Sequence, residues 1–219
     1  MRSFSEEMPN SVCEKKLIII HGFPGAGKST NAERFCEDNH NVGYVSIGNI
    51  WRAIKNKHKS SMHSEFVINA DITQPQPDEL TNDILFEEIS REHNDKELVL
   101  IDGYPRFESA IEPFFERISK EKSRVLGGIC LEATIQTSVI RMFGRGARKG
   151  EEQYTINGIN YADKYNQYLE HTHNRVLPVM QQRVPFLFID ANRESDTVYQ
   201  DFVSSVSKIV GLYGNTLNV

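Results

Sequence analysis

The residues best suited to chemistry form one run near the start of the chain: Gly22, Phe23, Pro24, Gly25, Ala26, Gly27, Lys28, Ser29 and Thr30. This run matches the pattern G-x-x-x-x-G-K-[ST] without a mismatch. Small residues let backbone N–H groups turn inward around phosphate oxygens, and the helix expected next points its N-terminus at the same anion. Lys28 supplies a charge to the outer phosphates, and the Ser29 hydroxyl can bind Mg²⁺. The run predicts a nucleoside triphosphate site.

A second group of polar residues follows two later apolar runs. Asp102 ends one of these runs, where a carboxylate can hold Mg²⁺ or its waters. Gly103 and Pro105 favour a turn that carries Arg106 into the cleft, and Arg52 follows the other run. Because a guanidinium group can clamp a phosphate with two hydrogen bonds, the two arginines together predict a second anion pocket facing the first.

The elements that must position these residues are visible as apolar runs separated by helical spacing. The apolar runs are Leu17–His21, Val42–Ser46, Leu98–Asp102, Arg124–Leu131 and Phe186–Asp190. The helical stretches lie near 29–39, 78–93, 108–120, 133–143, 160–182 and 195–212. This alternation predicts an α/β fold, a parallel sheet of about five strands with helices on both faces. Ligands of such sheets bind beyond the carboxyl ends of the strands, where the polar residues lie.

Composition narrows the classes of partner. The 219 residues suit one globular domain, or one domain with a small insert, and the net charge of -5 argues against nucleic-acid binding by bulk charge. No apolar run approaches the roughly 20 residues that span a bilayer, so no membrane partner is expected. The polar start lacks the apolar core of a secretory signal. The 3 cysteines lack C-x-x-C spacing, which predicts no zinc site and favours an intracellular, cytoplasmic location, an organelle included among the possibilities.

The chain divides into a short extension and one domain. Residues 1–15 are expected to be flexible, and residues 16–219 to form the domain. Two segments fit the strand–helix alternation poorly, 53–77 with its Gln-Pro-Gln-Pro string and 144–160 with its glycines. Both are candidates for mobile inserts.

Three strings in this order resemble adenylate kinases and their nucleoside monophosphate kinase relatives. They are Gly-x-Pro-Gly-x-Gly-Lys, Ser-x-Gly-x-x-x-Arg ending at Arg52, and Asp-Gly-Tyr-Pro-Arg ending at Arg106, with weaker similarity over residues 16–205. The resemblance implies a P-loop fold with an acceptor-binding insert near 48–77 and a short lid near 144–160 that carries no zinc. It further implies a monomer that uses Mg²⁺ and transfers the γ-phosphate of ATP to a nucleoside monophosphate, with AMP as the favoured acceptor.

The same resemblance implies roles by position. Gly22 to Thr30 would bind the ATP phosphates and Arg141 would lie over the ATP base. The acceptor would be held by Ser46, Gly48, Arg52, Gly103, Tyr104 and Arg106. Ser29 and Asp102 would organise Mg²⁺, partly through water. The catalytic set would be Lys28, Asp102, Arg106, Arg145 and Arg148, the last two from the lid.

One departure from the family concerns the choice of base. Ala110 stands where adenylate kinases carry a glutamine that reads the adenine edge, and an alanine side chain can neither donate nor accept a hydrogen bond. Glu108, Ser109 or Asn49 could substitute, or the enzyme could be permissive.

Other departures concern the phosphates and turnover. Ser29 replaces the usual glycine of the family, and Tyr168 stands where the family has an arginine after the lid. Lys164 or Arg175 could supply that charge; without it, the transition state loses one cation and transfer slows. Two further functions therefore stay open: a P-loop kinase acting on another small molecule, and a nucleotide-binding regulator with little turnover.

Overall fold

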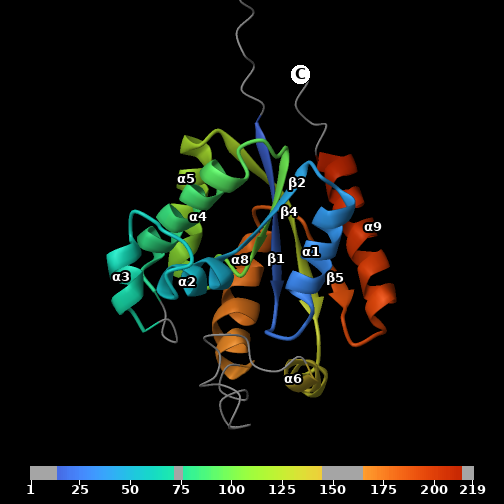
Figure 1. Ribbon diagram of the computed structural model, residues 1–219. Helices are drawn as coiled ribbons and strands as arrows, with labels where there is room; N and C mark the ends of the chain where they lie inside the picture. Colours follow the sequence, from blue (N-terminus) through green and yellow to red (C-terminus); the bar gives the residue numbers. More distant parts are fainter. Residues whose placement is uncertain (1–13, 72–75, 145–164, 214–219) are drawn as a thin grey trace, which may run out of the picture.

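The computed structural model describes residues 14–71, 76–144 and 165–213, and within them the expected α/β architecture is confirmed (Figure 1). The described residues form one five-stranded parallel sheet in the order β2-β3-β1-β4-β5. The strands are β1 (Lys15–Gly22), β2 (Val42–Ser46), β3 (Leu98–Asp102), β4 (Ser123–Glu132) and β5 (Phe186–Asp190). The extension expected over residues 1–15 is therefore one residue too long, because Lys15 already pairs with Ser123 of β4.

Helices cover both faces of this sheet (Figure 1). They are α1 (Lys28–Asp38), α2 (Ile47–Lys55), α3 (Ser64–Asn69), α4 (Asp78–Glu92), the 3₁₀ turn η1 (Glu108–Ala110), α5 (Ile111–Lys120), α6 (Ile135–Gly144), η3 (Tyr168–Val176), α8 (Leu177–Gln181) and α9 (Ser195–Tyr213). Helices α1 and α9 pack on one face, and α2, α4, α5 and α8 pack on the other. The segment 53–77, a candidate for a mobile insert outside the sheet, contains the end of α2 and the whole of α3.

Strand β1 lies at the centre of both apolar layers. Leu17 and Ile19 belong to the cluster beneath α2, α4 and α5, whereas Ile18 and Ile20 belong to the cluster beneath α1 and α9. All four side chains are fully buried. At about 1.5–3 kcal/mol for each buried aliphatic side chain, this strand contributes heavily to stability and fixes the position of the loop that follows it.

The segment before α8 is helical as expected, but part of it is wound as a π-helix rather than as an α-helix. The spacing of apolar residues predicts one α-helix over 160–182, whereas η3 is a π-helix over Tyr168–Val176 that runs directly into α8. The residues buried by η3 are Thr172 and Val176, four positions apart, and Thr172 is polar. The Thr172 hydroxyl donates to the backbone carbonyl of Arg106, a long-range contact that no periodicity within the segment encodes.

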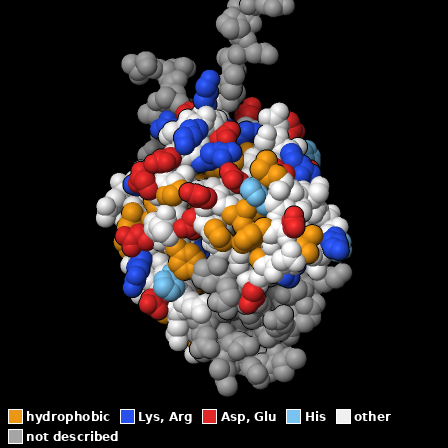
Figure 2. Space-filling model, turned by 90° about the vertical axis from the view of Figure 1, so that its left-hand side faces the viewer, with side chains coloured by type: hydrophobic (Ala, Val, Ile, Leu, Met, Phe, Trp, Pro, Cys, Tyr) orange, Lys and Arg blue, Asp and Glu red, His pale blue; other side chains and the backbone are white. Residues whose placement is uncertain are grey.

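The face formed by α3, α4 and α5 shows acidic and basic side chains interspersed, with apolar side chains in small groups between them (Figure 2). No helix within the described ranges is long and apolar enough to cross a bilayer.

Candidate nucleotide-binding site

The loop after β1 is shaped by two glycines that no other residue could replace. Gly22 has φ 142°, and a Cβ there would lie 2.5 Å from the carbonyl oxygen of Leu131. Gly25 has φ 90°, and its Cβ would lie 2.6 Å from the carbonyl oxygen of Ser138 in α6. Such distances are far below van der Waals contact, so the loop is packed tightly between β4 and α6 while its backbone N–H groups stay near the start of α1. A tight backbone of this kind is what the predicted phosphate site requires of the loop.

Lys28 begins α1 and reaches back over this loop. Its Nζ donates to the carbonyl oxygen of Gly22 at 2.7 Å and lies 3.8 Å from Asp102 Oδ1 at the end of β3. Asp102 is almost buried, and its other oxygen, Oδ2, accepts a 2.9 Å hydrogen bond from Tyr44 Oη. Within the described ranges Oδ1 accepts no hydrogen bond. The structure thus brings together the lysine and the carboxylate that the sequence placed in different segments.

The two expected acceptor arginines converge over Gly48. A Cβ placed on Gly48 would lie 3.4 Å from Arg52 Nη1 and 3.7 Å from Arg106 Nη2, so both guanidinium groups border the same open space. Arg52 donates to Asn49 Oδ1 at 2.6 Å, and Arg106 Nε donates to the carbonyl oxygen of Gly103 at 2.8 Å. A neutral oxygen thus contributes to the orientation of each arginine, and a guanidinium group held in this way can still clamp a phosphate with two hydrogen bonds.

Other residues assigned to the acceptor have different surroundings. Ser46 ends β2 and directly precedes α2, close to the arginine pair. Tyr104 is buried, its ring packs edge-on against Phe114, and its hydroxyl donates to the backbone of Asp78, so its side chain belongs to the core. Ala110 is fully buried as well, at the end of η1.

The side chains that could replace the missing base-reading group are partly committed elsewhere. Ser109 Oγ donates to Asp78 Oδ2 at 2.7 Å, and the Asn49 carbonyl oxygen accepts from Arg52. Glu108 is exposed. Of these three side chains, those of Ser109 and Asn49 thus already make hydrogen bonds within the protein.

Arg141, assigned to the ATP base, lies in α6 and is anchored by the loop after β5. Its guanidinium donates to the carbonyl oxygens of Ala191 at 2.7 Å and Arg193 at 3.1 Å. Thr30 is exposed in the first turn of α1. The lid arginines Arg145 and Arg148 lie outside the described residues.

Helix η3 and the residues just before it contact both the loop after β1 and the loop after β3. On one side Tyr165, just before η3, packs edge-on against Phe23 of the first loop with ring centroids 4.7 Å apart, and Tyr168 lies 5.9 Å from the same ring. On the other side the Thr172 hydroxyl donates to the Arg106 carbonyl at 3.3 Å. The π-helix thereby fixes the separation of the two loops.

Tyr168 itself supplies no charge to the site. Its hydroxyl lies 3.7 Å from the Cys130 thiol, and burial raises the pKa of the phenol, as does the neighbouring thiol. Lys164, one candidate for the missing cation, lies outside the described residues. The other, Arg175, is exposed and lies 3.9 Å from Glu170. The described residues thus leave the expected arginine position occupied by a neutral packing residue.

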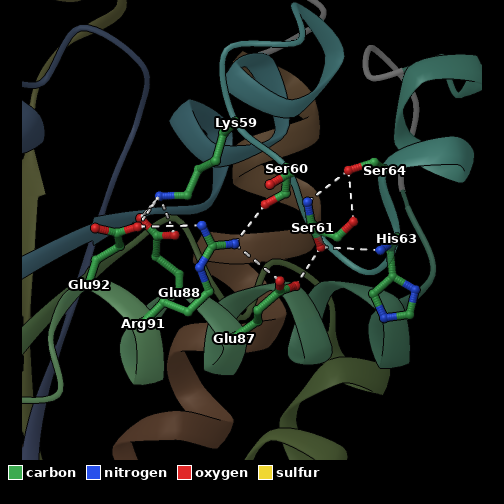
Figure 3. A network of polar contacts seen from close by, with 9 residues as sticks. All are labelled: Lys59, Ser60, Ser61, His63, Ser64, Glu87, Glu88, Arg91 and Glu92. Carbon is green, nitrogen blue, oxygen red and sulfur yellow. Dashed lines mark hydrogen bonds and ion pairs between the residues drawn. The ribbon is translucent and has the colours of Figure 1, made fainter.

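The loop between α2 and α3 is fixed to α4 by polar contacts (Figure 3). Lys59 Nζ lies 2.6 Å from Glu88 and 3.4 Å from Glu92, and Arg91 donates to the Ser60 carbonyl at 2.8 Å. The Ser61 hydroxyl donates to Glu87. Since α2 carries Arg52, these contacts set the orientation of one of the two arginines relative to the sheet.

His21, at the end of β1, has a pKa that is lowered by burial and by nearby positive charges. The side chain is buried, and its pKa is lowered from 6.5 to about 3, first by burial and then by the charges of Lys28 and Arg106. It is therefore a neutral imidazole at physiological pH, stacked towards Phe186.

Sequence reasoning missed two contacts at this site, those of Tyr44 and Thr172. Tyr44 precedes Ser46 by two residues on β2, so both side chains face the same side of the sheet, and Ser46 is paired with Asp102. That register signal becomes available only once β2 and β3 are known to be neighbours. No comparable signal exists for Thr172, because its contact depends on the π-helical winding.

Comparison with known proteins agrees with this geometry. The family model described as an AAA domain matches residues 21–160. The chain is 29% identical to an adenylate kinase of Oenococcus oeni over 201 residues, which cover 89% of this chain and 99% of the relative. It is 31% identical to an adenylate kinase of Flavobacterium johnsoniae over 153 residues, covering 67% and 79%, and 26% identical to one of Enterococcus faecalis, covering 88% and 98%.

We expect His21 to make the protein less stable in acid. Between pH 6.5 and about pH 3 the imidazole is protonated in the unfolded chain but not in the folded protein. The free energy of unfolding therefore decreases as the pH is lowered through this range. At pH 5 the expected loss in the free energy of unfolding is about 2 kcal/mol. Urea unfolding of wild type and His21→Leu at pH 7.5 and pH 5 tests this prediction. Between the two pH values, the free energy of unfolding of wild type should fall by about 2 kcal/mol more than that of the variant. The exposed His40→Gln is the control, and equal pH dependence of wild type and His21→Leu would contradict the assignment.

Lys59→Met should destabilise the protein by roughly 1.5–3 kcal/mol, because Glu88 loses a partner in a half-buried position. Urea unfolding gives the total, and hydrogen exchange should show the change concentrated in residues 56–64. Lys120→Met, on the exposed end of α5, provides the control. Protection of residues 56–64 that equals the wild-type value would show that the ion pair does not hold the loop.

Proposed function

This chain belongs to the adenylate kinase family, and from that premise we propose that it transfers the γ-phosphate of ATP to AMP with Mg²⁺, as a monomer. It is an ATP-dependent phosphotransferase of the nucleoside monophosphate kinase type. The observation that carries the acceptor assignment is the pair of guanidinium groups over Gly48. A neutral acceptor such as a nucleoside or a sugar would have no use for such a pair, whereas a monophosphate would be clamped by it.

The donor and acceptor phosphates would meet at the carboxyl edge of the sheet. The loop from Gly22 to Thr30 would hold the ATP phosphates with Lys28, and Arg52 with Arg106 would hold the acceptor phosphate. His21 supports their proximity, since the charges of Lys28 and Arg106 both lower its pKa. The two phosphates would thus approach each other within one field of positive charge.

The residues present are suited to Mg²⁺. Asp102 Oδ1 is a buried carboxylate oxygen without a hydrogen bond among the described residues, and hard oxygen donors of this kind are what Mg²⁺ or its water ligands require. Ser29, directly after Lys28, would provide a hydroxyl ligand. When bound, the ion would neutralise charge on the phosphates and help to align them.

Phosphoryl transfer asks the protein for positioning and charge rather than for covalent chemistry. In the proposed mechanism Lys28 and Arg106 stabilise charge on the transferring group and no general base is required. Arg141 would lie over the ATP base, and Arg145 and Arg148 would add charge from a lid near 144–160 that excludes water. Residues 48–77 would form the acceptor-binding insert.

The base of the acceptor would be read weakly. Ala110 is fully buried, so neither its methyl group nor any enlarged side chain could reach a bound base without repacking η1. A site that reads a base through side-chain hydrogen bonds rejects analogues by about 10⁴-fold or more, whereas one that relies on shape discriminates by about 10²-fold. We therefore expect AMP to be preferred but not required.

An acceptor panel tests both the function and its selectivity. ADP formation from ATP should be detected with AMP, and kcat/KM for GMP, CMP and UMP should lie within roughly 100-fold of the AMP value, because no side chain at 110 reads the base. Discrimination of 10⁴-fold or more would contradict weak reading. Tight ATP binding without turnover on any monophosphate would instead identify a nucleotide-binding regulator.

Arg106→Ala should raise the KM for AMP by roughly 10- to 100-fold, since one charged hydrogen-bonding clamp on the acceptor phosphate is lost. The dissociation constant of ATP, measured without AMP, should change little. Arg183→Ala is the matched control, because that arginine pairs with Glu112 on the surface. Unchanged AMP binding in Arg106→Ala would refute the double clamp.

A further inference from the structure

The phenol of Tyr44 is hydrogen-bonded to the carboxylate at the centre of the site. Tyr44 Oη donates to Asp102 Oδ2 at 2.9 Å. Tyr44 lies in the middle of β2, opposite Leu100, and Asp102 is the last residue of β3. The tyrosine ring packs among the apolar side chains beneath α1 and α9, so the hydroxyl approaches Asp102 from the core side of the sheet.

Burial keeps this hydroxyl a hydrogen-bond donor. A tyrosine hydroxyl is an uncharged donor, and here the ring packs among apolar side chains while the hydroxyl donates to Asp102 Oδ2. A neutral donor stabilises the carboxylate without bringing a positive charge that would compete with a metal ion for it.

The bond divides the two oxygens of Asp102 between different tasks. Oδ2 is held by Tyr44, while Oδ1 is buried, accepts no hydrogen bond among the described residues and faces Lys28 Nζ at 3.8 Å. Rotation of the carboxylate would break the bond to the phenol. The oxygen on the P-loop side is therefore fixed in direction, and no donor in the described part of the chain occupies it.

We propose that Tyr44 is a positioning residue for the phosphoryl-transfer reaction: its hydroxyl orients Asp102 so that Oδ1 is presented to Mg²⁺ or to a water bound to Mg²⁺ in the ATP complex. This inference rests on the proposed function. It adds a residue that contacts neither nucleotide and acts only through Asp102. Groups that orient a metal ligand in this way change metal affinity or activity by roughly 10- to 100-fold when they are removed.

The chain contains a matched control for this bond. Tyr199 in α9 is a buried tyrosine, and its hydroxyl donates to Asp38 Oδ2 at the end of α1. It therefore makes the same kind of bond, from a phenol to an aspartate. This second pair lies at the opposite end of α1 from Lys28. Tyr44→Phe and Tyr199→Phe therefore remove the same atom from the same kind of bond, one at the site and one away from it.

The experiment measures Mn²⁺ binding to the complex of the protein with ATP, by electron paramagnetic resonance of free Mn²⁺, beside kcat and the KM for AMP. Tyr44→Phe should weaken Mn²⁺ binding roughly 10-fold or more and lower kcat, with little change in the KM for AMP. Tyr199→Phe should leave all three at wild-type values. Combined with Asp102→Asn, Tyr44→Phe should have no additional effect on Mn²⁺ binding, because it acts only through that carboxylate.

The outcomes separate the two levels of the proposal. Wild-type Mn²⁺ affinity in Tyr44→Phe, or equal losses in Tyr44→Phe and Tyr199→Phe, would overturn the positioning role while leaving the kinase activity intact. Additive effects of Tyr44→Phe and Asp102→Asn would overturn it as well. Absence of transfer to AMP in the wild-type protein would instead overturn the proposed function. Circular dichroism at the assay temperature establishes that each variant is folded before binding is measured.

Discussion

The rest of the structure depends on holding several positive side chains close together at one edge of a sheet. Lys28, Arg52 and Arg106 come from three segments, and like charges so near one another repel. Each is oriented by a neutral oxygen, from Gly22, Asn49 and Gly103 in turn. The Asp102 carboxylate lies 3.8 Å from Lys28 and offsets part of this repulsion. Burial, and after it the charges of Lys28 and Arg106, lower the pKa of His21, so this imidazole stays neutral beside the site.

Rigid packing around this edge is what keeps the cations from separating. Strand β1 is buried on both faces, and η3 touches Phe23 of one loop and the Arg106 backbone of the other. The contacts of Lys59 and its neighbours fix the loop after α2 to α4 (Figure 3). These contacts lie on three sides of the site and each involves a different element. The positions of the arginines are therefore properties of the whole domain rather than of the loops alone.

The strands and the phosphate loop could be predicted from the sequence because their signals are local. Val42–Ser46, Leu98–Asp102 and Phe186–Asp190 end where the apolar runs end, and Gly25 is required by its own backbone conformation. The π-helix, the helix α3 and the bond from Tyr44 to Asp102 could not be predicted, because each depends on a neighbour distant in the sequence. Thr172 illustrates the reason: a buried threonine is explained by the carbonyl of Arg106, 66 residues away.

The net charge of -5 describes the chain but not the surface that binds ligands. Many of the acids lie in ion pairs away from the site, such as Glu88 with Lys59 and Glu112 with Arg183. Close to Lys28 lies the Asp102 carboxylate, and one of its oxygens accepts a hydrogen bond from the Tyr44 phenol. Screening at physiological salt acts over roughly 8 Å, so acids on the outer faces of α4 and α5 scarcely weaken the field at the carboxyl edge of the sheet. An acidic protein can consequently gather several cations at one edge of its sheet when many of its acids form ion pairs elsewhere on the molecule.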